Sequence, residues 1–296
     1  MFKLNLNKFW TKFNLLIIDE FDNLDLENEI NNLFINYEKI FSRFKNDSEL
    51  SILNKNKRAE LSSLFFELFK KNIELNNLTN WFFNPFIDVE SIWYSNKKLD
   101  LNYTKKNKIL FNENFELKWN LLTLKNNSNL DFWWSWKWFF VDYVSLYLKN
   151  KGFKNYFIDF WGDVYVSWRK NKDDIWRIWI ENPFLIWETI GYINLTDSSI
   201  SSSGNYFRNW DINWKQFHHI INPLNNLNEN EIKMITIISK NTYFSDSIAT
   251  ALFNMWIKNA ILFLNKNNID WLIIWMNAKA YFSKWFIKKY WFKKEY

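Results

Sequence analysis

The run DFWWSWKWFFVD, residues 131–142, places four tryptophans around one lysine. Trp133, Trp134, Trp136 and Trp138 would lie on both faces of a strand, because successive side chains of a strand point to opposite sides. In a helix the same four side chains would be spread most of the way round the axis. No single buried surface can take all four, so this run is not an ordinary core segment.

The counts of glycine and tryptophan are unusual in opposite directions. The 296 residues include 4 glycines and 20 tryptophans, whereas an average usage of about 7% would give roughly 20 glycines. Richness in Asn, Lys, Ile and Phe is typical of AT-rich coding DNA, but that bias does not explain abundant tryptophan. We hypothesise that many tryptophans are glycines in the living protein, encoded by UGA codons that the organism reads as glycine. UGG codons at these positions would contradict the hypothesis.

The composition excludes several kinds of site. The chain has no cysteine, which removes disulfides, thiolate metal sites and thiol nucleophiles. No apolar run approaches the roughly 18 residues that a membrane span needs, and the N-terminus shows no export signal, so we expect a soluble protein. The net charge of +6 is a mild excess, and we interpret the basic end, residues 284–296, as a solvated tail in preference to a nucleic-acid contact.

Helical and strand patterns are mixed along the chain. Amphipathic helices are predicted over 30–44 and 61–77, and Asp47 or Ser48 in the polar turn between them can cap a helix. The remaining predicted elements are short strands after residue 85, a helix from 141 to a glycine stop at Gly152, strands over 156–168, 176–183, 189–195 and 271–276, and a helix over 244–262. This order predicts an α+β fold. No repeat or low-complexity linker forces a boundary, so we expect one domain over residues 1–296.

With glycine in place of tryptophan, the opening run reads DFGGSGKGFFVD, a glycine-rich loop that leads into a helix. Glycines in such a loop allow positive φ and let backbone groups approach a phosphate or a metal ion closely. Lys137 would supply a positive charge at the same place. A glycine-rich structural turn explains the loop equally well, so the loop alone does not define a function.

Six segments in a fixed order resemble the ApbE family of flavin transferases, which move FMN from FAD onto a threonine or serine of a target protein. The segments are FSRFKNDSELSILN (41–54), LTNWFFNPFIDVESIWY (78–94), DFWWSWKWFFVD (131–142), FIDFWGDVYVSW (157–168), SSSGNYFRNWDINWKQFHHIINP (201–223) and SDSIATALFNMW (245–256). The resemblance covers nearly the whole chain. It implies an ApbE-type, T-fold-like architecture of mixed sheets and flanking helices.

Many tryptophans fall where the family has glycine, as the recoding hypothesis requires. They are Trp10, Trp81, Trp93, Trp133, Trp138, Trp161, Trp214 and Trp256. Trp176 falls where the family often has tryptophan, so we interpret it as a genuine tryptophan. The chain departs from the family pattern at Asn222, which replaces the usual Asp, and at Ser202, which replaces Thr. The turn PLNN after Asn222 also lacks the usual glycine.

The resemblance implies a Mg²⁺ site. Asp246 and Thr250 are four residues apart on a predicted helix, so a carboxylate and a hydroxyl share one face and form a hard-oxygen site suited to Mg²⁺. Without the resemblance, such a pair would be interpreted as a cap or a surface pair. The resemblance adds the backbone oxygen of Trp134 as a ligand and places Ala249 beside the ion.

The resemblance also implies contacts with FAD. The residues concerned are Phe9, Phe44, Phe82, Phe83, Asn84, Asp131, Lys137 and His219. Phe44 can stack on a flat ring and Lys137 can meet a phosphate, although Phe44 and Phe82 could instead be ordinary core residues. The H-I-I-N-P context favours His219 over its neighbour His218 for a site role. We do not assign Ser203 as a nucleophile, because no Ser-His-Asp order is present.

Together these features predict an Mg²⁺-dependent transfer of FMN from FAD to a Thr or Ser hydroxyl, with release of AMP and with Asp246 or His219 as the base. The implied partner is an acceptor flavoprotein, typically of a membrane electron-transfer complex, and not a nucleic acid; the oligomeric state is not predicted. Family members usually act on the cell-envelope side, but a cytoplasmic location fits the absence of a visible leader. The alternatives are an FAD-binding or FAD-hydrolysing protein of the same fold, and a non-enzymatic aromatic, basic protein that binds nucleic acid or membrane surfaces.

Overall fold

The computed structural model describes most of the chain. The described residues are 1–8, 11–20, 25–86, 111–132, 135–171, 174–185, 187–206, 209–212, 215–225, 228, 231–290 and 292–294. They form two compact units. Unit 1 comprises residues 1–24, 137–220 and 229–296, and unit 2 comprises residues 25–136 and 221–228.

Unit 1 is built on a large antiparallel sheet, in which the described residues contribute eight strands in the order β1-β2-β6-β7-β10-β13-β14-β15. The strands are β1 (Phe2–Lys8), β2 (Thr11–Ile17), β6 (Tyr156–Phe160), β7 (Asp163–Ser167), β10 (Ser198–Gly204), β13 (Ile232–Ser239), β14 (Asp270–Trp275) and β15 (Ala280–Phe282). The central strands β7, β10, β13 and β14 are dominated by buried residues, as expected for a sheet covered on both faces.

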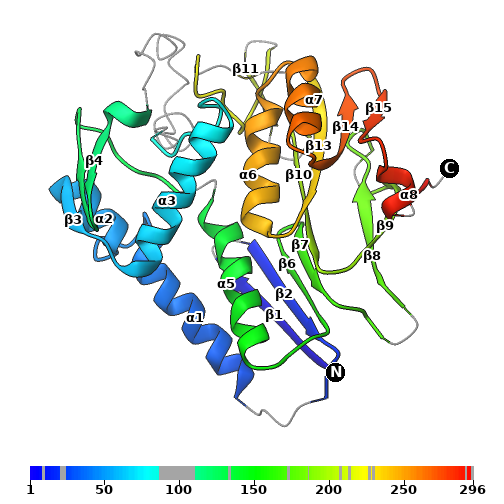
Figure 1. Cartoon of the computed structure of the whole chain (residues 1–296), viewed down its shortest axis with the longest axis horizontal. Helices are drawn as coiled ribbons and strands as arrows, with labels where there is room; N and C mark the ends of the chain where they lie inside the picture. Colours follow the sequence, from blue (N-terminus) through cyan, green and yellow to red (C-terminus); the bar gives the residue numbers. More distant parts are fainter. Residues whose placement is uncertain are drawn as a thin grey trace. The chain divides into compact units, whose positions relative to one another are not determined.

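Helices cover one face of this sheet (Figure 1). They are α5 (Trp136–Asn150), α6 (Thr242–Phe253) and α7 (Ile257–Lys266). Phe140 of α5 packs edge-on against Phe13 of β2 and Phe160 of β6, with ring centroids 6.1 and 6.3 Å apart. Helix α6 lies along β10 and β13 (Figure 1), so the residues of α6 that face the sheet are buried.

The opposite face of the sheet packs on a smaller layer. This layer consists of β8 (Trp176–Glu181), β9 (Thr189–Leu195), β16 (Lys293–Lys294) and α8 (Phe286–Tyr290). Its core includes Trp176 and Ile193, which pack with Val166 and Leu272 of the large sheet. A separate hairpin is formed by β11 (Asn209–Ile212) and β12 (Lys215–His218). Unit 1 is therefore a helix layer and a small-sheet layer on either side of one sheet.

Unit 2 combines helices with a small antiparallel sheet. Its elements are α1 (Leu26–Phe41), α2 (Glu49–Asn56), α3 (Ser63–Leu78), the 3-10 helix η2 (Phe111–Glu113), and the strands β3 (Arg58–Glu60), β4 (Phe115–Lys118) and β5 (Leu121–Leu124) in the order β3-β5-β4. Ser48 caps α2, because its hydroxyl accepts a hydrogen bond from the Ser51 amide at 3.1 Å. Phe41, Phe65 and Phe132 form a buried aromatic cluster with centroids 5.2 to 5.9 Å apart.

The structure corrects three expectations about elements. The segment 156–168 is a hairpin of β6 and β7, because the chain reverses at Trp161 and Gly162. The helix expected over 244–262 is two helices, α6 and α7, separated at residues 254–256. The segment expected to be a polar turn contains helix α2. In each case a short turn interrupts or precedes a pattern that looks continuous in the sequence.

The mixed sheets and flanking helices confirm the predicted α+β class. The predicted loop before residue 136 is also confirmed in its described part, since Ser135 donates a backbone hydrogen bond to Phe132 and α5 begins at the next residue. Trp136 and Trp138 are both buried, and Trp133 and Trp134 lie outside the described residues. None of the helices in the described ranges is long and apolar enough to cross a bilayer. The assignment of residues 1–296 to one domain stays a prediction.

Candidate functional site

Helix α6 is fixed at its start by hydrogen bonds to side chains of unit 1. At its start, Asp142 of α5 accepts hydrogen bonds from the amides of Thr242 and Tyr243, at 2.7 and 3.0 Å. The Asn241 side chain accepts one from the Phe244 amide at 2.9 Å, which satisfies another free amide of the first turn. These contacts fix where the helix begins and therefore which residues it directs toward the sheet.

A row of hydroxyl groups joins α6 to β10. The Ser245 hydroxyl lies 2.9 Å from the hydroxyls of both Ser199 and Ser201. One turn further along, the Thr250 hydroxyl lies 3.2 Å from that of Ser203. Alternate residues of β10 thus meet successive turns of α6, because residues i and i+2 of a strand face the same side. This row places polar oxygen atoms in an otherwise apolar layer.

Asp246 lies in this buried row. Its side chain is 6% exposed, and Ala249, three residues later, is fully buried. Burial raises the pKa of the Asp246 carboxyl well above its ordinary value, and repulsion from the Asp163 carboxylate adds to the shift, while Lys137 opposes it. A carboxylate held in this way favours a proton or a cation beside it.

Asp163 is a second buried carboxylate that the sequence did not single out. It begins β7, and its neighbour Val164 pairs with Ile200 of β10, next to Ser201. Burial raises the pKa of Asp163 well above its ordinary value; a hydrogen bond from the Ser201 side chain opposes this, and Asp159 adds repulsion. The available signal was the family-like segment FIDFWGDVYVSW, in which Asp163 follows Trp161 and Gly162, but an Asp after a glycine is also an ordinary turn residue.

Lys137 supplies positive charge to the same region of unit 1. Its side chain is 2% exposed, which is rare for lysine unless a partner is present. The ammonium group lies 5.0 Å from the centre of the Trp161 ring and attracts the carboxylates of Asp163 and Asp246. Lys137, Asp163, Asp246 and Thr250 therefore belong to one polar region of unit 1.

The two histidines differ in their surroundings. His218 is buried, its ring packs edge-on against Phe253 at 5.4 Å between centroids, and its Nδ1 accepts a hydrogen bond from the Ile220 amide. His219 is half-buried. His218 is therefore a core residue and His219 is the more accessible imidazole; a site role for His219 stays a prediction.

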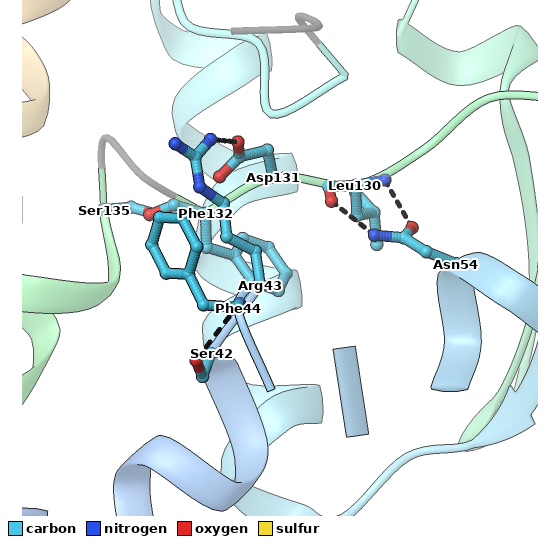
Figure 2. Close-up of polar contacts among 8 residues, drawn as sticks. All are labelled: Ser42, Arg43, Phe44, Asn54, Leu130, Asp131, Phe132 and Ser135. Carbon is cyan, nitrogen blue, oxygen red and sulfur yellow. Dashed lines mark hydrogen bonds and ion pairs between the residues drawn. The ribbon is translucent and has the colours of Figure 1, made fainter. Parts of the chain in front are cut away.

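In unit 2, the start of the FSRF segment meets the loop that precedes α5 (Figure 2). Arg43 forms an ion pair with Asp131 at 2.5 Å between Nη1 and Oδ2, and both side chains are largely buried. The Asn54 side chain both donates to and accepts from the backbone of Leu130, each at 2.8 Å. Asp131 is thus anchored on both sides, and Arg43 is a site candidate that the sequence analysis missed.

Phe44 lies beside this ion pair and is 54% exposed (Figure 2). The Arg43 guanidinium lies 4.9 Å from the centre of its ring. An exposed ring at this position is not a core residue, so the core alternative for Phe44 was wrong. A large, exposed aromatic side chain of this kind can stack on a flat ligand.

The segment after α3 carries the remaining predicted FAD contacts in the described part of unit 2. Phe83 and Asn84 are buried and Phe82 is half-buried. The Phe83 carbonyl accepts a hydrogen bond from Asn76, and the Asn84 side chain accepts one from the Phe86 amide at 2.9 Å. Phe9 and Trp134 lie outside the described residues. Within those residues, no cluster of three or more His, Cys, Asp or Glu side chains could hold a metal ion.

The fold recurs in solved flavin transferase structures. It matches the flavin transferase ApbE of Vibrio cholerae with a TM-score of 0.84 and 24% identity, over 98% of each chain. It also matches the ApbE protein of Thermotoga maritima with a TM-score of 0.86 and 19% identity, over 98% of each chain. At these identities the likeness shows the fold alone.

Sequence comparison then identifies the family. The ApbE family profile matches residues 9–273, so the chain belongs to the ApbE family. A Chlamydia muridarum protein named FAD:protein FMN transferase is 25% identical over 76% of this chain and 74% of its own length. A Buchnera aphidicola protein of the same name is 28% identical over 88% of this chain and 82% of its own length.

Proposed function

We propose that this protein is an FAD:protein FMN transferase. The observation that carries the proposal is membership of the ApbE family together with relatives of that name that match most of the chain. In the reaction, an acceptor hydroxyl oxygen bonds to the phosphorus of FMN while the phosphoanhydride bond to AMP breaks. AMP leaves, the acceptor carries FMN, and the hydroxyl proton passes to a base.

The polar region of unit 1 supports a role in this chemistry. Lys137 is a buried cation that can meet a phosphate oxygen. We propose Asp246 or His219 as the base for the acceptor hydroxyl. Burial raises the pKa of the Asp246 carboxyl above its ordinary value, which makes its carboxylate a stronger base than an exposed one.

The residues of unit 1 also fit the Mg²⁺ ion that the family resemblance implies. Asp246 offers a buried carboxylate and Thr250 a hydroxyl on the same helix, which are the oxygen donors that Mg²⁺ prefers. A cation would offset the burial and the repulsion from Asp163 that together raise the pKa of Asp246. When bound, Mg²⁺ supplies charge neutralisation for the diphosphate. Trp134 and Ala249 remain proposed at this site from the resemblance.

The proposed acceptor is a flavoprotein with a reactive threonine or serine, and the proposed FAD contacts are those predicted from the sequence. Phe44 is the strongest of these contacts, because its exposed ring is supported by the Arg43–Asp131 ion pair and can stack on the flavin or adenine ring. An acceptor from a membrane electron-transfer complex is the expected class.

The test is covalent flavin transfer in a purified system. The protein is incubated with FAD, MgCl₂ and a threonine-bearing flavoprotein acceptor, and flavin fluorescence of the acceptor band is read after denaturing electrophoresis. Labelling that disappears when the acceptor threonine is changed to valine supports the proposal. Release of AMP without labelled acceptor, across several acceptors, would instead support FAD hydrolysis.

A further inference from the structure

Asp163 has a carboxylate oxygen that receives no hydrogen bond from the described residues. The side chain is 5% exposed, and its Oδ1 atom has no hydrogen-bond partner among the residues that the structure describes. The other contacts of the carboxylate come from the Ser201 side chain and the Ser202 backbone. Buried carboxylate oxygens are expensive to leave unpaired, so such an atom points to a missing ligand.

The position of Asp163 indicates that this missing ligand is the cation proposed to bind Asp246 and Thr250 of α6. Ser201, which donates to Asp163, also contacts Ser245, the residue before Asp246. Two strand residues further along, Ser203 contacts Thr250. Residues 201–203 of β10 therefore contact both Asp163 and the helix α6 that carries Asp246 and Thr250, and the two carboxylates interact electrostatically.

We propose that Asp163 is a further oxygen ligand of the divalent cation site formed by Asp246 and Thr250, contributed through Oδ1. This proposal rests on the Mg²⁺ site of the proposed function. It adds a carboxylate from the sheet to a site otherwise assigned to the helix. Lys137 lies in the same polar region and keeps its proposed role as the cation that contacts a phosphate oxygen.

Mn²⁺ binding tests the proposal without any flavin chemistry. Free Mn²⁺ is measured by electron paramagnetic resonance during titration of the unmodified protein and of the Asp163→Asn, Asp246→Asn and Asp159→Asn variants. We expect Asp163→Asn and Asp246→Asn each to weaken Mn²⁺ binding by about tenfold to a hundredfold. Asp159→Asn is the matched control, because Asp159 adds negative charge near Asp163 while its carboxylate already accepts hydrogen bonds from Asn14 and Gly162.

A second variant separates ligation from charge. Asp163→Glu keeps the negative charge but moves the oxygen atoms. If Asp163 is a ligand, this variant should bind Mn²⁺ more weakly. If Asp163 acts only through its charge, the Mn²⁺ affinity should not change. Urea unfolding of every variant verifies that it is folded. Unchanged Mn²⁺ affinity in Asp163→Asn would overturn the proposal while leaving the cation site intact. No Mn²⁺ binding by the unmodified protein would overturn the cation site as well.

A different observation concerns the backbone at tryptophan positions. Twelve residues other than glycine have positive φ in the described part of the chain, and five of them are tryptophans: Trp81, Trp119, Trp161, Trp168 and Trp187, with φ between 53° and 75°. Five of the other seven are Asn or Asp, the types that tolerate this region, whereas a bulky residue there is an outlier. All five tryptophans are exposed.

The turn between β6 and β7 shows what the backbone demands. Phe160 pairs with Asp163, which leaves a two-residue turn of Trp161 and Gly162 with φ of 64° and 91°. Positive φ at both positions defines a type I′ turn, for which Gly-Gly and Asn-Gly are preferred sequences. Glycine at 161 was already expected from the family resemblance, so here the dihedral angle and the resemblance agree.

Trp119 occupies an equivalent position in unit 2. Lys118 pairs with Leu121, so the turn between β4 and β5 contains only Trp119 and Asn120. Trp119 has a φ of 56°, and Asn120 has no positive φ. Positive φ at the first position alone is typical of a type II′ turn, which takes glycine there. The Trp119 side chain is 93% exposed, so no packing explains tryptophan.

Two exposed tryptophans of unit 1 follow the same rule. The Glu188 amide donates to the Leu185 carbonyl, which makes Trp187, with a φ of 75°, the third residue of a turn. Positive φ at the third position is typical of a type II turn and favours glycine. Trp168 has a φ of 53° directly after β7 and is 57% exposed. No family motif predicted glycine at 119, 168 or 187.

We infer that Trp119, Trp168 and Trp187 are glycines in the native protein, in addition to the positions derived from the resemblance. Trp176 and Trp271 are the matched contrast, because both are buried and their indole N–H groups donate to Ser167 and Asn265. These two are tryptophans by packing and hydrogen bonding. The described tryptophans therefore include exposed ones at positions that favour glycine and buried ones that the fold requires, and the sequence as written does not distinguish them.

The gene and the protein test this inference together. We expect UGA codons at 119, 168 and 187 and UGG codons at 176 and 271, with glycine masses in the corresponding peptides of the protein isolated from its own organism. UGG at 119, 168 and 187 would overturn it. In recombinant protein, Trp119→Gly, Trp168→Gly and Trp187→Gly should each raise the urea midpoint of unfolding, whereas Trp176→Gly should lower it; a lowered midpoint in all four would contradict the inference.

Discussion

The buried carboxylates of unit 1 and unit 2 differ in how their negative charge is balanced. In unit 1, Asp163 and Asp246 are buried near each other and repel, with Lys137 as a counter-charge. In unit 2, Asp131 is buried against Arg43 in a direct ion pair, and the neighbouring Phe44 ring is exposed. In unit 1, the two carboxylates carry more negative charge than Lys137 balances, so a bound cation can neutralise the excess. In unit 2, Arg43 already neutralises Asp131, and the ion pair supports the exposed ring of Phe44.

This difference distinguishes residues proposed to take part in the reaction from residues that hold a binding loop in place. A buried carboxylate with a raised pKa lowers the stability of the folded chain at neutral pH, so it is maintained where function requires it. A paired carboxylate stabilises the loop that it anchors. Substitution of the buried carboxylates of unit 1 should therefore reduce activity without reducing stability, whereas substitution of Arg43 in unit 2 should reduce stability.

The largest expected effect is on catalysis in unit 1. Asp246→Asn should slow single-turnover flavin transfer by about 100-fold to 1000-fold, because it removes a charged group from the reacting centre. The unfolding free energy in the presence of chelator should stay the same or rise, since the repulsion with Asp163 disappears. Rapid quench followed by fluorescence of the acceptor gives the rate, and a decrease below tenfold would contradict the assignment.

The next effect is on the stability of unit 2. Arg43→Met keeps the length of the side chain but removes the charge, and it leaves the Asp131 carboxylate buried without its guanidinium. We expect a loss of about 2 kcal/mol in the free energy of unfolding. Urea denaturation measures it. Lys45→Met is the control, because the Lys45–Glu38 pair is more exposed and should contribute less than about 1 kcal/mol.

A smaller effect is expected at the exposed ring. Phe44→Ala should weaken FAD binding by about tenfold, corresponding to roughly 1 to 1.5 kcal/mol of stacking, with a change in unfolding free energy within about 0.5 kcal/mol. Isothermal titration with FAD measures the affinity. Phe184→Ala removes a ring of comparable exposure, 42% against 54%, from unit 1. Equal losses in the two variants would mean that Phe44 has no specific role.

The smallest effect is a pH dependence of the metal-free protein. Because the folded-state pKa values of Asp163 and Asp246 are raised above the ordinary 3.8, their contribution to stability is fully present below about that pH and is lost as pH rises. Lys137 reduces the shift and Asp159 increases that of Asp163. Thermal melting in chelator should show this decline, and Asp163→Asn should reduce it. If the melting temperature of the unmodified protein instead rises steadily between pH 4 and pH 7, and that of Asp163→Asn does not, the predicted pH dependence is wrong.

Sequence reasoning reached much of the candidate site because motifs are local. The i to i+4 spacing of Asp246 and Thr250 and the FSRF segment could be read directly from neighbouring residues. Arg43 was missed because its partner Asp131 is 88 residues away. The split between α6 and α7 was missed because apolar spacing continues through residues 254–256. Periodicity indicates which face is buried, but not where a chain reverses.

The sequence alone determined the family, the helix face that carries Asp246 and Thr250, and the excess of tryptophan over glycine. Only the tertiary structure decided that Asp163 lies in the same buried polar region as Asp246, and that Trp119, Trp168 and Trp187 occupy positive-φ positions. The physical reason is that burial, charge repulsion and turn dihedral angles depend on how distant strands and helices pack, and sequence spacing does not report that packing.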